Sequence, residues 1–391
     1  MEMVRVGVIG IGNIGFAHAS CIYQKKINGL VLAAVCDSNP ERLKVANAEL
    51  PGVDTCADYE QLLCRPDIDM VIVSVPHPLH SVVAMRAFAC GKHVLIEKPA
   101  DIAVSKVLQM NAAAKASGKR FGIMFNQRTG SLFRKAREIV HSGALGQLKR
   151  SVWIVTNWYR TQHYYDSGSW RATWQGEGGG VLMNQAPHQL DLWQWICGMP
   201  VRVTAFCDEA RYHNIEVEDD ATIYVRFPGG ADGVFITSTG EFPGTNRLEI
   251  SGTKGKLLLE NGSLKWWKLE QDEREVCVQS QNSFERIPMT CEEILPEDES
   301  TGHAAILQNF ADALRLGTEL IAPGYDGINE VTLQNAAYLS AWKGNVPVQL
   351  PFDEQEYDAL LAEKQRLSQL ANTKGSTSVN TAYHERWQIN W

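Results

Sequence analysis

A glycine loop near the start of the chain restricts the fold more than any other feature. The apolar, β-branched run from Val4 to Ile9 predicts a strand buried on both faces, and Gly10, Gly12 and Gly15 follow in the spacing G-x-G-x-x-G. Gly10 allows a tight turn, Gly12 allows a pyrophosphate to approach the backbone, and Gly15 allows a helix to pack closely on the sheet. The N–H groups at the start of that helix would face the phosphates. Taken alone, the spacing also fits an ordinary turn between a strand and a helix.

A second apolar run, from Leu30 to Cys36, predicts another buried strand, which ends at Asp37. Asp37 lies 22 residues after Gly15, close to the spacing of about 20 residues expected for the acid that binds the adenosine ribose. Its carboxylate would accept hydrogen bonds from the ribose hydroxyls and repel a 2′-phosphate, which favours NAD over NADP. Asp37 can also serve as the N-cap of the helix expected near Pro40, and the two roles are compatible.

Length, charge and cysteine content limit the class of protein. At 391 residues the chain is longer than one usual domain, so two domains are expected. A net charge of -8 argues against general nucleic-acid binding and fits small-molecule partners. No apolar run approaches the length of about 20 residues that spans a bilayer, so no membrane association is expected, and no secretion signal is visible. The nine scattered cysteines form no C-x-x-C pair, which predicts a cytoplasmic location and no metal site.

Strands and helices alternate through the first third of the chain, which predicts βαβ units and a parallel sheet. A third buried strand runs from Met70 to Val75 and ends at Pro76. His77 and His80 follow at the carboxyl end of that strand, the edge at which ligands bind in open parallel sheets. Further strands are expected at 93–96 and 121–125, and helices at 41–49, 58–63, 81–90 and 105–117.

Glu97-Lys98-Pro99 directly follows the strand expected at 93–96. A charged pair at a strand end is often only a solvated surface feature. However, the proline holds Lys98 in an extended backbone conformation, which fixes the direction of its amine. A lysine held at the ligand edge of a nucleotide-binding sheet can hydrogen-bond a substrate hydroxyl and help to remove its proton. The spacing alone leaves both roles open.

The chain resembles the Gfo/Idh/MocA family, which includes glucose–fructose oxidoreductase and inositol dehydrogenase. The matching residues are the glycine loop, Asp37, Ser74-Val75-Pro76, Glu97-Lys98-Pro99 and the segment 178–191, and the resemblance extends to about residue 352. It implies an α/β Rossmann domain with a parallel sheet, followed by an α+β domain with an open, mostly antiparallel sheet. The expected units are 1–125 for NAD binding, 126–355 for substrate binding and oligomerisation, and 356–391 as a C-terminal helix, linker and tail.

The resemblance also implies roles for individual residues. In the family the lysine of E-K-P assists proton transfer and its bond to proline is often cis, and Lys98 and Pro99 inherit these expectations. We expect cofactor contacts from the glycine loop, the ribose-binding acid and the loops after later strands, namely Gly10, Gly12, Asn13, Ile14, Gly15, Asp37, Ser74, Pro76, His77, His80, Glu97, Lys98 and Asn126.

A segment early in the second domain is rich in aromatic, amide and arginine side chains. Residues 157–165 read N-W-Y-R-T-Q-H-Y-Y and residues 169–171 read S-W-R. This mixture suits a sugar, whose C–H faces stack on rings while its hydroxyls need polar partners. A loop that contacts another subunit has a similar composition. The expected substrate contacts are Arg128, Asn157, Tyr159, Tyr164, Trp170, Arg171, Asn184 and Asp191.

Residues 178–191 are expected to open a helix on which Asn184, His188 and Asp191, at i, i+4 and i+7, share one face. The resemblance gives position 184 as aspartate in many dehydrogenases, beside a catalytic histidine at His188. Because asparagine exchanges no protons, Asn184 would position the substrate, and His188 would act as the general base. Asp191 would orient the histidine or lie in a core ion pair. Arg128 would bind a substrate hydroxyl or carboxylate, or pair with an acid at the domain boundary.

The rest of the chain fits the second domain. Short strands separated by turns are expected from 201 to 267, and helices at 304–317 and 330–343. The family commonly covers one face of this sheet by subunit packing, which implies a homo-oligomer (a dimer, tetramer or hexamer). A Ser/Thr/Gly-rich linker at 372–380 leads to a tail, 383–391, that would dock on a neighbour or be disordered.

These features predict an NAD-dependent dehydrogenase that oxidises a secondary hydroxyl of a sugar, glycoside or cyclitol, with Lys98 and His188 handling the hydroxyl proton. Two alternatives come from other classes. One is a glycosidase that uses tightly held NAD for transient oxidation and elimination, as some relatives do. The other is a non-catalytic sensor of a dinucleotide or sugar, against which the retention of Lys98 and His188 argues.

Overall fold

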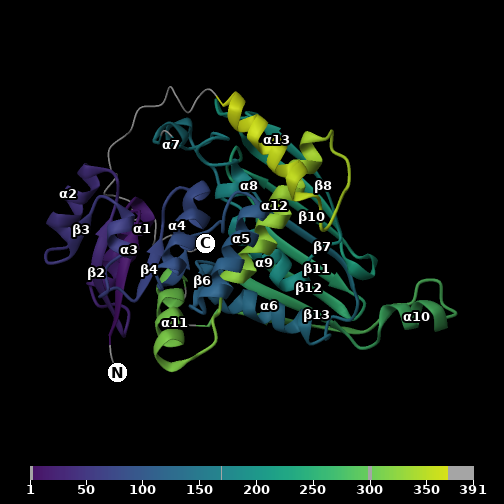
Figure 1. The fold of residues 1–391 in the computed structure, drawn as a ribbon. Coiled ribbons are helices and arrows are strands. Elements are labelled where there is room, and N and C mark those ends of the chain that lie inside the picture. Colours follow the sequence, from purple (N-terminus) through teal and green to yellow (C-terminus); the bar gives the residue numbers. More distant parts are fainter. Residues whose placement is uncertain (1–2, 169, 298–301, 369–391) are drawn as a thin grey trace.

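Two β-sheets of different topology organise the chain, and helices lie between and beside them (Figure 1). The computed structural model describes residues 3–168, 170–297 and 302–368. The predicted linker at 372–380 and tail at 383–391 lie outside these residues. Within the described ranges, no helix combines the length and the apolar character needed to cross a membrane.

The first sheet is parallel, as the alternation of strands and helices predicts. Its strands lie side by side in the order β3 (Asp54–Cys56), β2 (Leu30–Cys36), β1 (Val4–Ile9), β4 (Met70–Val73), β5 (His93–Ile96) and β6 (Phe121–Ile123). The connecting helices are α1 (Asn13–Tyr23), α2 (Pro40–Glu49), α3 (Tyr59–Leu63), α4 (His80–Ala89) and α5 (Val104–Ser117). The apolar residues of β1 and β4 are buried on both faces, which is why these strands read as continuous apolar runs.

The strand order reverses between β1 and β4, so the loops that leave these two strands open a crevice at the carboxyl edge of the sheet. The glycine loop packs tightly against the loop after β4. Gly10 has a φ of +84°, and a Cβ there would lie 2.6 Å from the Ser74 carbonyl oxygen. A Cβ on Gly15 would lie 1.9 Å from the Gly10 carbonyl oxygen. Only glycine fits either position.

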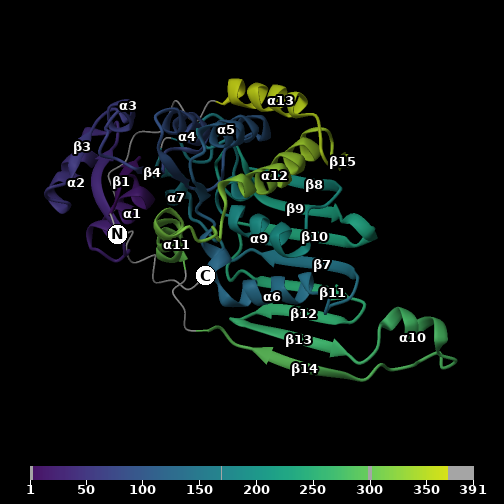
Figure 2. The same ribbon diagram turned by 60° about the horizontal axis from the view of Figure 1, so that its bottom comes forward.

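The second sheet is larger and mostly antiparallel, with one parallel pair, β7 with β10. Its order is β14 (Met289–Ile294), β13 (Ser263–Leu269), β12 (Gly255–Glu260), β11 (Asn246–Gly252), β7 (Leu148–Val155), β10 (Asp232–Ser238), β9 (Glu218–Arg226), β8 (Arg202–Glu209) and β15 (Val348–Gln349). Burial alternates along β9 to β12, because one face meets helices and the other does not. The helices α6 (Ser131–His141), α9 (Pro187–Cys197) and α12 (Gly327–Trp342) lie across one face (Figure 2).

Two elements at the far edge of this sheet were not predicted. The helix α10 (Glu273–Gln279) and the edge strand β14 project beyond the rest of the domain (Figure 2). Nearly all of β14 is exposed, so its sequence carries no alternation of apolar and polar residues. The strand is held in place by its antiparallel hydrogen bonds to β13, which the sequence pattern does not reveal.

The chain returns to the first unit after the second sheet is built. The helix α11 (Gly302–Leu316) lies within the predicted 126–355 unit, yet Ile306, Leu307 and Phe310 join the core of the first sheet. The Asn335 side chain of α12 also reaches back: its Oδ1 accepts a hydrogen bond from the Val104 backbone N–H at 2.9 Å. By contrast, α13 (Glu354–Leu367), predicted as part of a separate C-terminal segment, packs on the second core. The boundaries at 125 and 355 therefore do not separate the two cores.

Candidate active site

The start of α1 has the features that a bound pyrophosphate requires. No side chain caps this helix, so its first N–H groups remain available. A Cβ built on Gly12 would meet only the Arg42 guanidinium, at 3.9 Å, so a ligand can approach the backbone there. The Ser74 hydroxyl is buried and has no hydrogen-bond partner among the described residues. These observations fit a dinucleotide; direct contacts from Asn13, Ile14 and Pro76 stay predictions.

Asp37 is buried at the end of β2, and three donors hold its carboxylate. Its Oδ2 accepts hydrogen bonds from the Ile11 N–H at 2.9 Å and from Arg42 Nη1 at 3.2 Å, and its Oδ1 accepts one from the Asn39 N–H at 2.9 Å. The predicted N-cap role is wrong, because the Asn39 side chain caps α2 by accepting from the Glu41 N–H. Asp37 Oδ1 retains acceptor capacity for a ribose hydroxyl.

Glu97, Lys98 and Pro99 follow β5 at the same sheet edge, and the Lys98–Pro99 peptide bond is cis, as the family resemblance implies. Glu97 Oε1 lies 2.7 Å from His18 Nε2 on α1. Burial of Glu97 acts to raise its pKa, but the hydrogen bond from His18 and the charges of neighbouring cations bring this pKa down to about 2. Glu97 is therefore an anion that ties α1 to the loop carrying Lys98.

His80 does not offer a ring nitrogen to a cofactor. Its Nδ1 lies 2.7 Å from the Pro99 carbonyl oxygen, its Nε2 lies 2.8 Å from the Val75 carbonyl oxygen, and the side chain is buried. The direct cofactor contact predicted for His80 has no support in this placement. His80 instead fixes the turn at Pro99 and hence the backbone of Lys98.

The Lys98 amine crosses from the first sheet to the second domain. Its Nζ donates a hydrogen bond of 2.7 Å to the Asn184 carbonyl oxygen. Burial lowers the pKa of Lys98 from its ordinary value, and the Glu97 carboxylate opposes this effect. An amine with a lowered pKa is better matched to proton transfer near neutral pH than a free lysine.

The predicted single helix at 178–191 is two helices, α8 (Val181–Asn184) and α9 (Pro187–Cys197). Pro187 occupies the first turn of α9, where a backbone N–H would have no partner within the helix, so its absence costs nothing. The same proline cannot continue the preceding helix, so α8 ends before it. Burial and the nearby Lys98 charge lower the pKa of His188 well below its usual range. His188 Nδ1 is buried and has no partner within the described residues. His188 is therefore a neutral imidazole close to Lys98.

Asp191 lies one helical turn after His188 on α9, and its carboxylate forms a buried bidentate pair with Arg128. Arg128 Nε and Nη2 donate to the two Asp191 oxygens at 2.7 and 2.6 Å, and Arg128 Nη1 donates to Asp326 Oδ2 at 2.6 Å. The Arg128 and Asp191 side chains are each 1% exposed. Arg128 thus pairs with acids and Asp191 lies in a core ion pair, which are the alternatives predicted for them, and the substrate contacts predicted for both residues stay predictions without geometric support.

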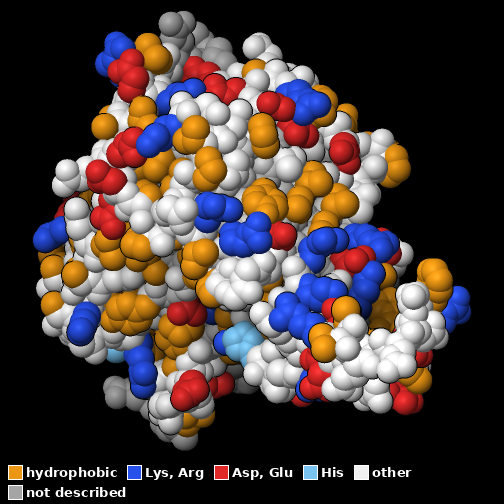
Figure 3. Space-filling model, turned by 90° about the vertical axis from the view of Figure 1, so that its right-hand side faces the viewer, with side chains coloured by type: hydrophobic (Ala, Val, Ile, Leu, Met, Phe, Trp, Pro, Cys, Tyr) orange, Lys and Arg blue, Asp and Glu red, His pale blue; other side chains and the backbone are white. Residues whose placement is uncertain are grey.

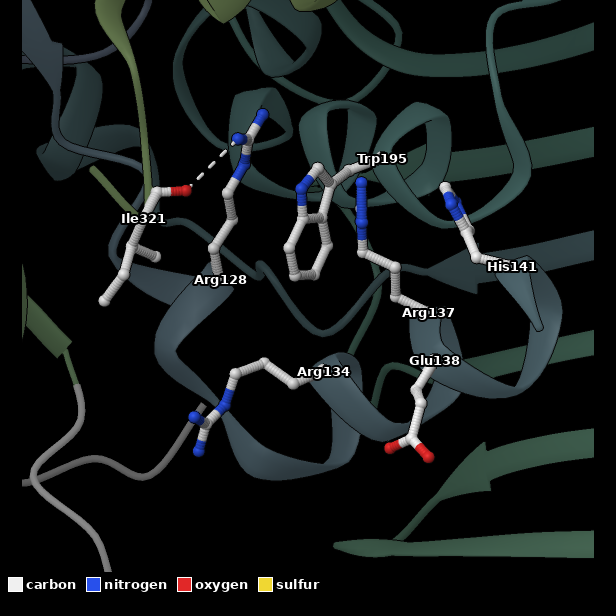
Figure 4. A pocket seen from close by; sticks show the side chains of 7 residues that line it. All are labelled: Arg128, Arg134, Arg137, Glu138, His141, Trp195 and Ile321. Carbon is white, nitrogen blue, oxygen red and sulfur yellow. Dashed lines mark hydrogen bonds between the residues drawn. The ribbon is translucent and has the colours of Figure 1, made fainter. Parts of the chain in front are cut away.

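Arg128 also borders a pocket of about 340 Å³ that is separate from Lys98 and His188 (Figure 4). Trp195 of α9 stands between Arg128 and Arg137 of α6, with the Arg137 guanidinium 4.5 Å from its ring centroid. Most of the residues that line the pocket belong to α6 rather than to the carboxyl edge of the first sheet. The pocket therefore has no part in the reaction described below.

The aromatic segment divides into two parts. Tyr164 lies beside Asn184, since its hydroxyl is 3.5 Å from Asn184 Nδ2 and accepts a 2.8 Å hydrogen bond from Arg171 Nη1. The Arg171 guanidinium lies 4.7 Å from the Trp170 ring centroid, and that ring meets the His77 ring edge-on at 5.6 Å. The structure thus brings the predicted substrate contacts Tyr164, Trp170, Arg171 and Asn184 together.

Asn157 and Tyr159 are exposed side chains. Tyr159 packs on Phe242, with their ring centroids 5.7 Å apart. Substrate contacts from Asn157 and Tyr159 stay predictions without geometric support.

Three further residues of the site escaped the sequence analysis: His18, His303 and Glu177. His18 lies one helical turn after Gly15, but a lone histidine on a helix gave no signal. His303 comes from α11; its Nδ1 lies 3.3 Å from Asn126 Nδ2, and its ring centroid lies 5.5 Å from that of His18. Glu177 precedes the glycine run of 178–180, and its carboxylate contacts the Asn184 amide. Its position before that run was the one available clue.

The parallel sheet, the glycine crevice and the half-buried lysine at its edge define an NAD-binding oxidoreductase of the Rossmann class. The sequence matches the oxidoreductase family with an NAD-binding Rossmann fold over residues 4–125, and the GFO/IDH/MocA C-terminal domain over residues 133–258. The chain belongs to the Gfo/Idh/MocA family.

Individual relatives agree with this assignment. Myo-inositol 2-dehydrogenase of Thermotoga maritima is 28% identical over 264 residues, which are 66% of this chain and 75% of that protein. The structure of the WlbA dehydrogenase from Bordetella pertussis in complex with NADH and UDP-GlcNAcA is similar, with a TM-score of 0.77 and 26% identity over 90% of this chain and 99% of that one. A glycosyl hydrolase family 109 protein of Shewanella sp. (strain ANA-3) is 31% identical over 194 residues, 46% of this chain and 42% of that protein. The chain thus spans less than half the length of some curated relatives it matches.

Proposed function

We propose that this protein oxidises a secondary hydroxyl of a sugar, glycoside or cyclitol to a ketone. The observation that carries the proposal is the Lys98 amine, which bridges to Asn184 beside a neutral His188 at the ligand edge of the NAD-binding sheet. Bound NAD would supply the hydride acceptor. His188 would accept the hydroxyl proton, and Lys98 would stabilise the developing alkoxide by a charge-assisted hydrogen bond. Tyr164, Trp170 and Arg171 would form the wall against which the ring of the substrate lies.

The test is a screen of sugars, glycosides and cyclitols for NADH formation, with the ketone product identified by NMR. A dehydrogenase forms one ketone for each NADH. Formation of NADH with a matching ketone at one ring carbon is the expected outcome, and it also identifies the oxidised position.

One finding favours a second candidate, the match to a glycosyl hydrolase family 109 protein. A glycosidase of this kind would retain NAD, oxidise the sugar transiently and eliminate the aglycone. An assay with aryl glycosides distinguishes the two activities, because phenol release and NADH formation are measured in the same reaction. Release of the phenol without net NADH would replace the dehydrogenase proposal by the glycosidase, whereas NADH without phenol release supports the dehydrogenase.

Replacing Asp37 by alanine is expected to weaken NAD binding about tenfold or more, because a hydrogen bond to a charged group is lost. Discrimination against NADP should fall at the same time, since Arg42 is freed from Asp37 to meet a 2′-phosphate. Calorimetric titration with both dinucleotides measures these changes. In the Asp37→Ala/Arg42→Ala variant the gain in NADP binding should disappear. Tighter binding of NADP than of NAD by the unaltered protein would remove the ribose role from Asp37.

We also propose a homo-oligomer in the cytoplasm. The face of the second sheet opposite α6, α9 and α12 carries ion pairs such as Arg247–Glu249 beside apolar side chains, a mixed surface that suits subunit packing. Figure 3 shows the right-hand side of the molecule, where Lys and Arg side chains gather in a band beside a group of hydrophobic side chains. The cytoplasm suits the nine cysteines, which are all free thiols. Sedimentation of the full chain tests the oligomer.

A further inference from the structure

A buried carboxylate lies behind Asn184 and has no role in the scheme above. Glu177 is 2% exposed, and it precedes α8 by a short glycine run. One carboxylate oxygen, Oε2, accepts a 2.6 Å hydrogen bond from the Ala172 N–H, and the other, Oε1, accepts one from Asn184 Nδ2. Burial raises the pKa of Glu177, and the Arg171 charge opposes this rise. Each of its two oxygens thus meets a donor.

These contacts determine which way the Asn184 amide faces. Asn184 Nδ2 donates to Glu177 Oε1, so the atom of Asn184 that meets Glu177 belongs to its NH₂ group. The same Nδ2 atom also lies 3.5 Å from the Tyr164 hydroxyl oxygen. No described residue donates to Asn184 Oδ1. The amide therefore presents its oxygen, an acceptor, on the side away from Glu177.

The same asparagine is also the anchor of the catalytic lysine. The Asn184 carbonyl oxygen accepts the 2.7 Å hydrogen bond from Lys98 Nζ. A displacement of Asn184 would thus move both the Oδ1 acceptor and the Lys98 amine. Glu177 contacts the side chain of Asn184, the residue that positions both the Oδ1 acceptor and the Lys98 amine.

We propose that Glu177 is a positioning residue: its carboxyl group locks the Asn184 amide so that Oδ1 accepts a hydrogen bond from a substrate hydroxyl while the backbone of Asn184 holds Lys98. Asn184 is then the contact that selects a hydroxyl donor, and Glu177 sets its orientation. This inference rests on the proposed oxidation of a polyol. It predicts a substrate with a free hydroxyl beside the reacting carbon, because Oδ1 needs a donor.

Glutamine in place of Glu177 replaces the carboxyl group by an amide and keeps the volume of the side chain. The new side-chain amide at position 177 can turn either of its ends toward Asn184, so Asn184 loses its fixed orientation. We expect Glu177→Gln to raise KM and to lower kcat/KM about 10- to 100-fold, the range that a misplaced substrate contact costs, with NAD affinity unchanged. Asn184→Asp alone places two carboxylates in contact, which must share a proton, and is expected to be impaired as well.

The double variant Glu177→Gln/Asn184→Asp transfers the carboxylate from one position to the other. The amide at position 177 then donates to the carboxylate at position 184, and one acceptor oxygen again faces the substrate. We expect the double variant to exceed each single variant in kcat/KM. A purely structural role for Glu177 predicts instead that the two losses add.

Glu218→Gln is the matched control. Glu218, the first residue of β9, is a second fully buried glutamate, but its carboxyl group accepts hydrogen bonds from the backbone N–H groups of Gly180 and Leu182 at the start of α8 rather than from the Asn184 amide. Its replacement should lower the melting temperature and leave KM unchanged. An effect of Glu177→Gln on KM no larger than that of Glu218→Gln would overturn the proposal.

A second measurement needs no substrate and separates this inference from the proposed function. In the full chain with NADH and ¹⁵N-labelled asparagine, the side-chain NH₂ signal of Asn184 is identified by its loss in Asn184→Asp. One of its protons should resonate downfield, as expected for a hydrogen bond to a carboxylate, and should move upfield in Glu177→Gln but not in Glu218→Gln. An ordinary shift in the unaltered protein would refute the lock, whichever substrate is found. Absence of NADH formation with an intact downfield signal would refute only the oxidation.

Discussion

Alanine in place of Lys98 is expected to lower kcat by about 10³-fold. The variant loses the charge-assisted donor to the alkoxide, and removal of one such donor costs about 10²–10³-fold. It also loses the hydrogen bond from the Lys98 amine to the Asn184 carbonyl oxygen, so Asn184 is held less firmly at the site. Initial rates of NADH formation at saturating sugar measure the effect.

NAD binding by the Lys98→Ala variant should survive, because neither the glycine loop nor Asp37 contacts the amine. Lys44→Ala is the matched control, since Lys44 pairs with Glu41 on the surface of α2 and its side chain is 72% exposed. The control should keep full turnover. A kcat for Lys98→Ala within a few fold of that of Lys44→Ala would contradict the role of Lys98.

His188→Ala is expected to lower kcat by roughly 10²–10⁴-fold, the contribution of a general acid–base group. The unaltered enzyme should show a particular pH profile. Burial and Lys98 lower the pKa of His188 well below its usual range, so His188 stays neutral and able to accept a proton throughout the neutral range. Activity in the oxidising direction should therefore persist below about pH 6.5, the ordinary pKa of histidine, and fall only in stronger acid.

His141→Ala is the control for this change, because His141 is an exposed histidine at the end of α6. It should alter neither kcat nor the acid limb of the pH profile. If His188→Ala kept near-normal turnover and the same acid limb, the proton would pass to Lys98 alone. An acid limb at the ordinary histidine pKa in the unaltered enzyme would instead contradict the lowered pKa of His188.

Features that depend on neighbouring residues could be predicted from the sequence. The strands of the first sheet read as short apolar runs because both of their faces are covered, and the loop from Gly10 to Gly15 has a spacing set by local backbone geometry. The family resemblance of the E-K-P motif predicted the cis Lys98–Pro99 peptide bond and the role of Lys98. Each of these signals lies within a few residues of the structure that it determines.

Features that depend on distant residues could not be predicted. Arg128 could equally have bound a substrate, and only the approach of Asp191 and Asp326, 63 and 198 residues away, commits it to a buried ion pair. The break at Pro187 places Asn184 on α8 and leaves only His188 and Asp191 together on α9, so the three residues do not share the single helix that was expected. No local pattern places His303 beside Asn126, because most of the second sheet separates α11 from the first sheet along the chain.

The return of α11 and α12 to the first sheet has a consequence for protein engineering. An NAD-binding fragment cut at residue 125 would expose the surface of the sheet that Ile306, Leu307 and Phe310 cover. It would also leave the Val104 N–H without the Asn335 side chain that accepts from it. The cofactor unit is therefore not a portable module, and a chimera that exchanges it between relatives has to carry the 302–316 segment of the same parent.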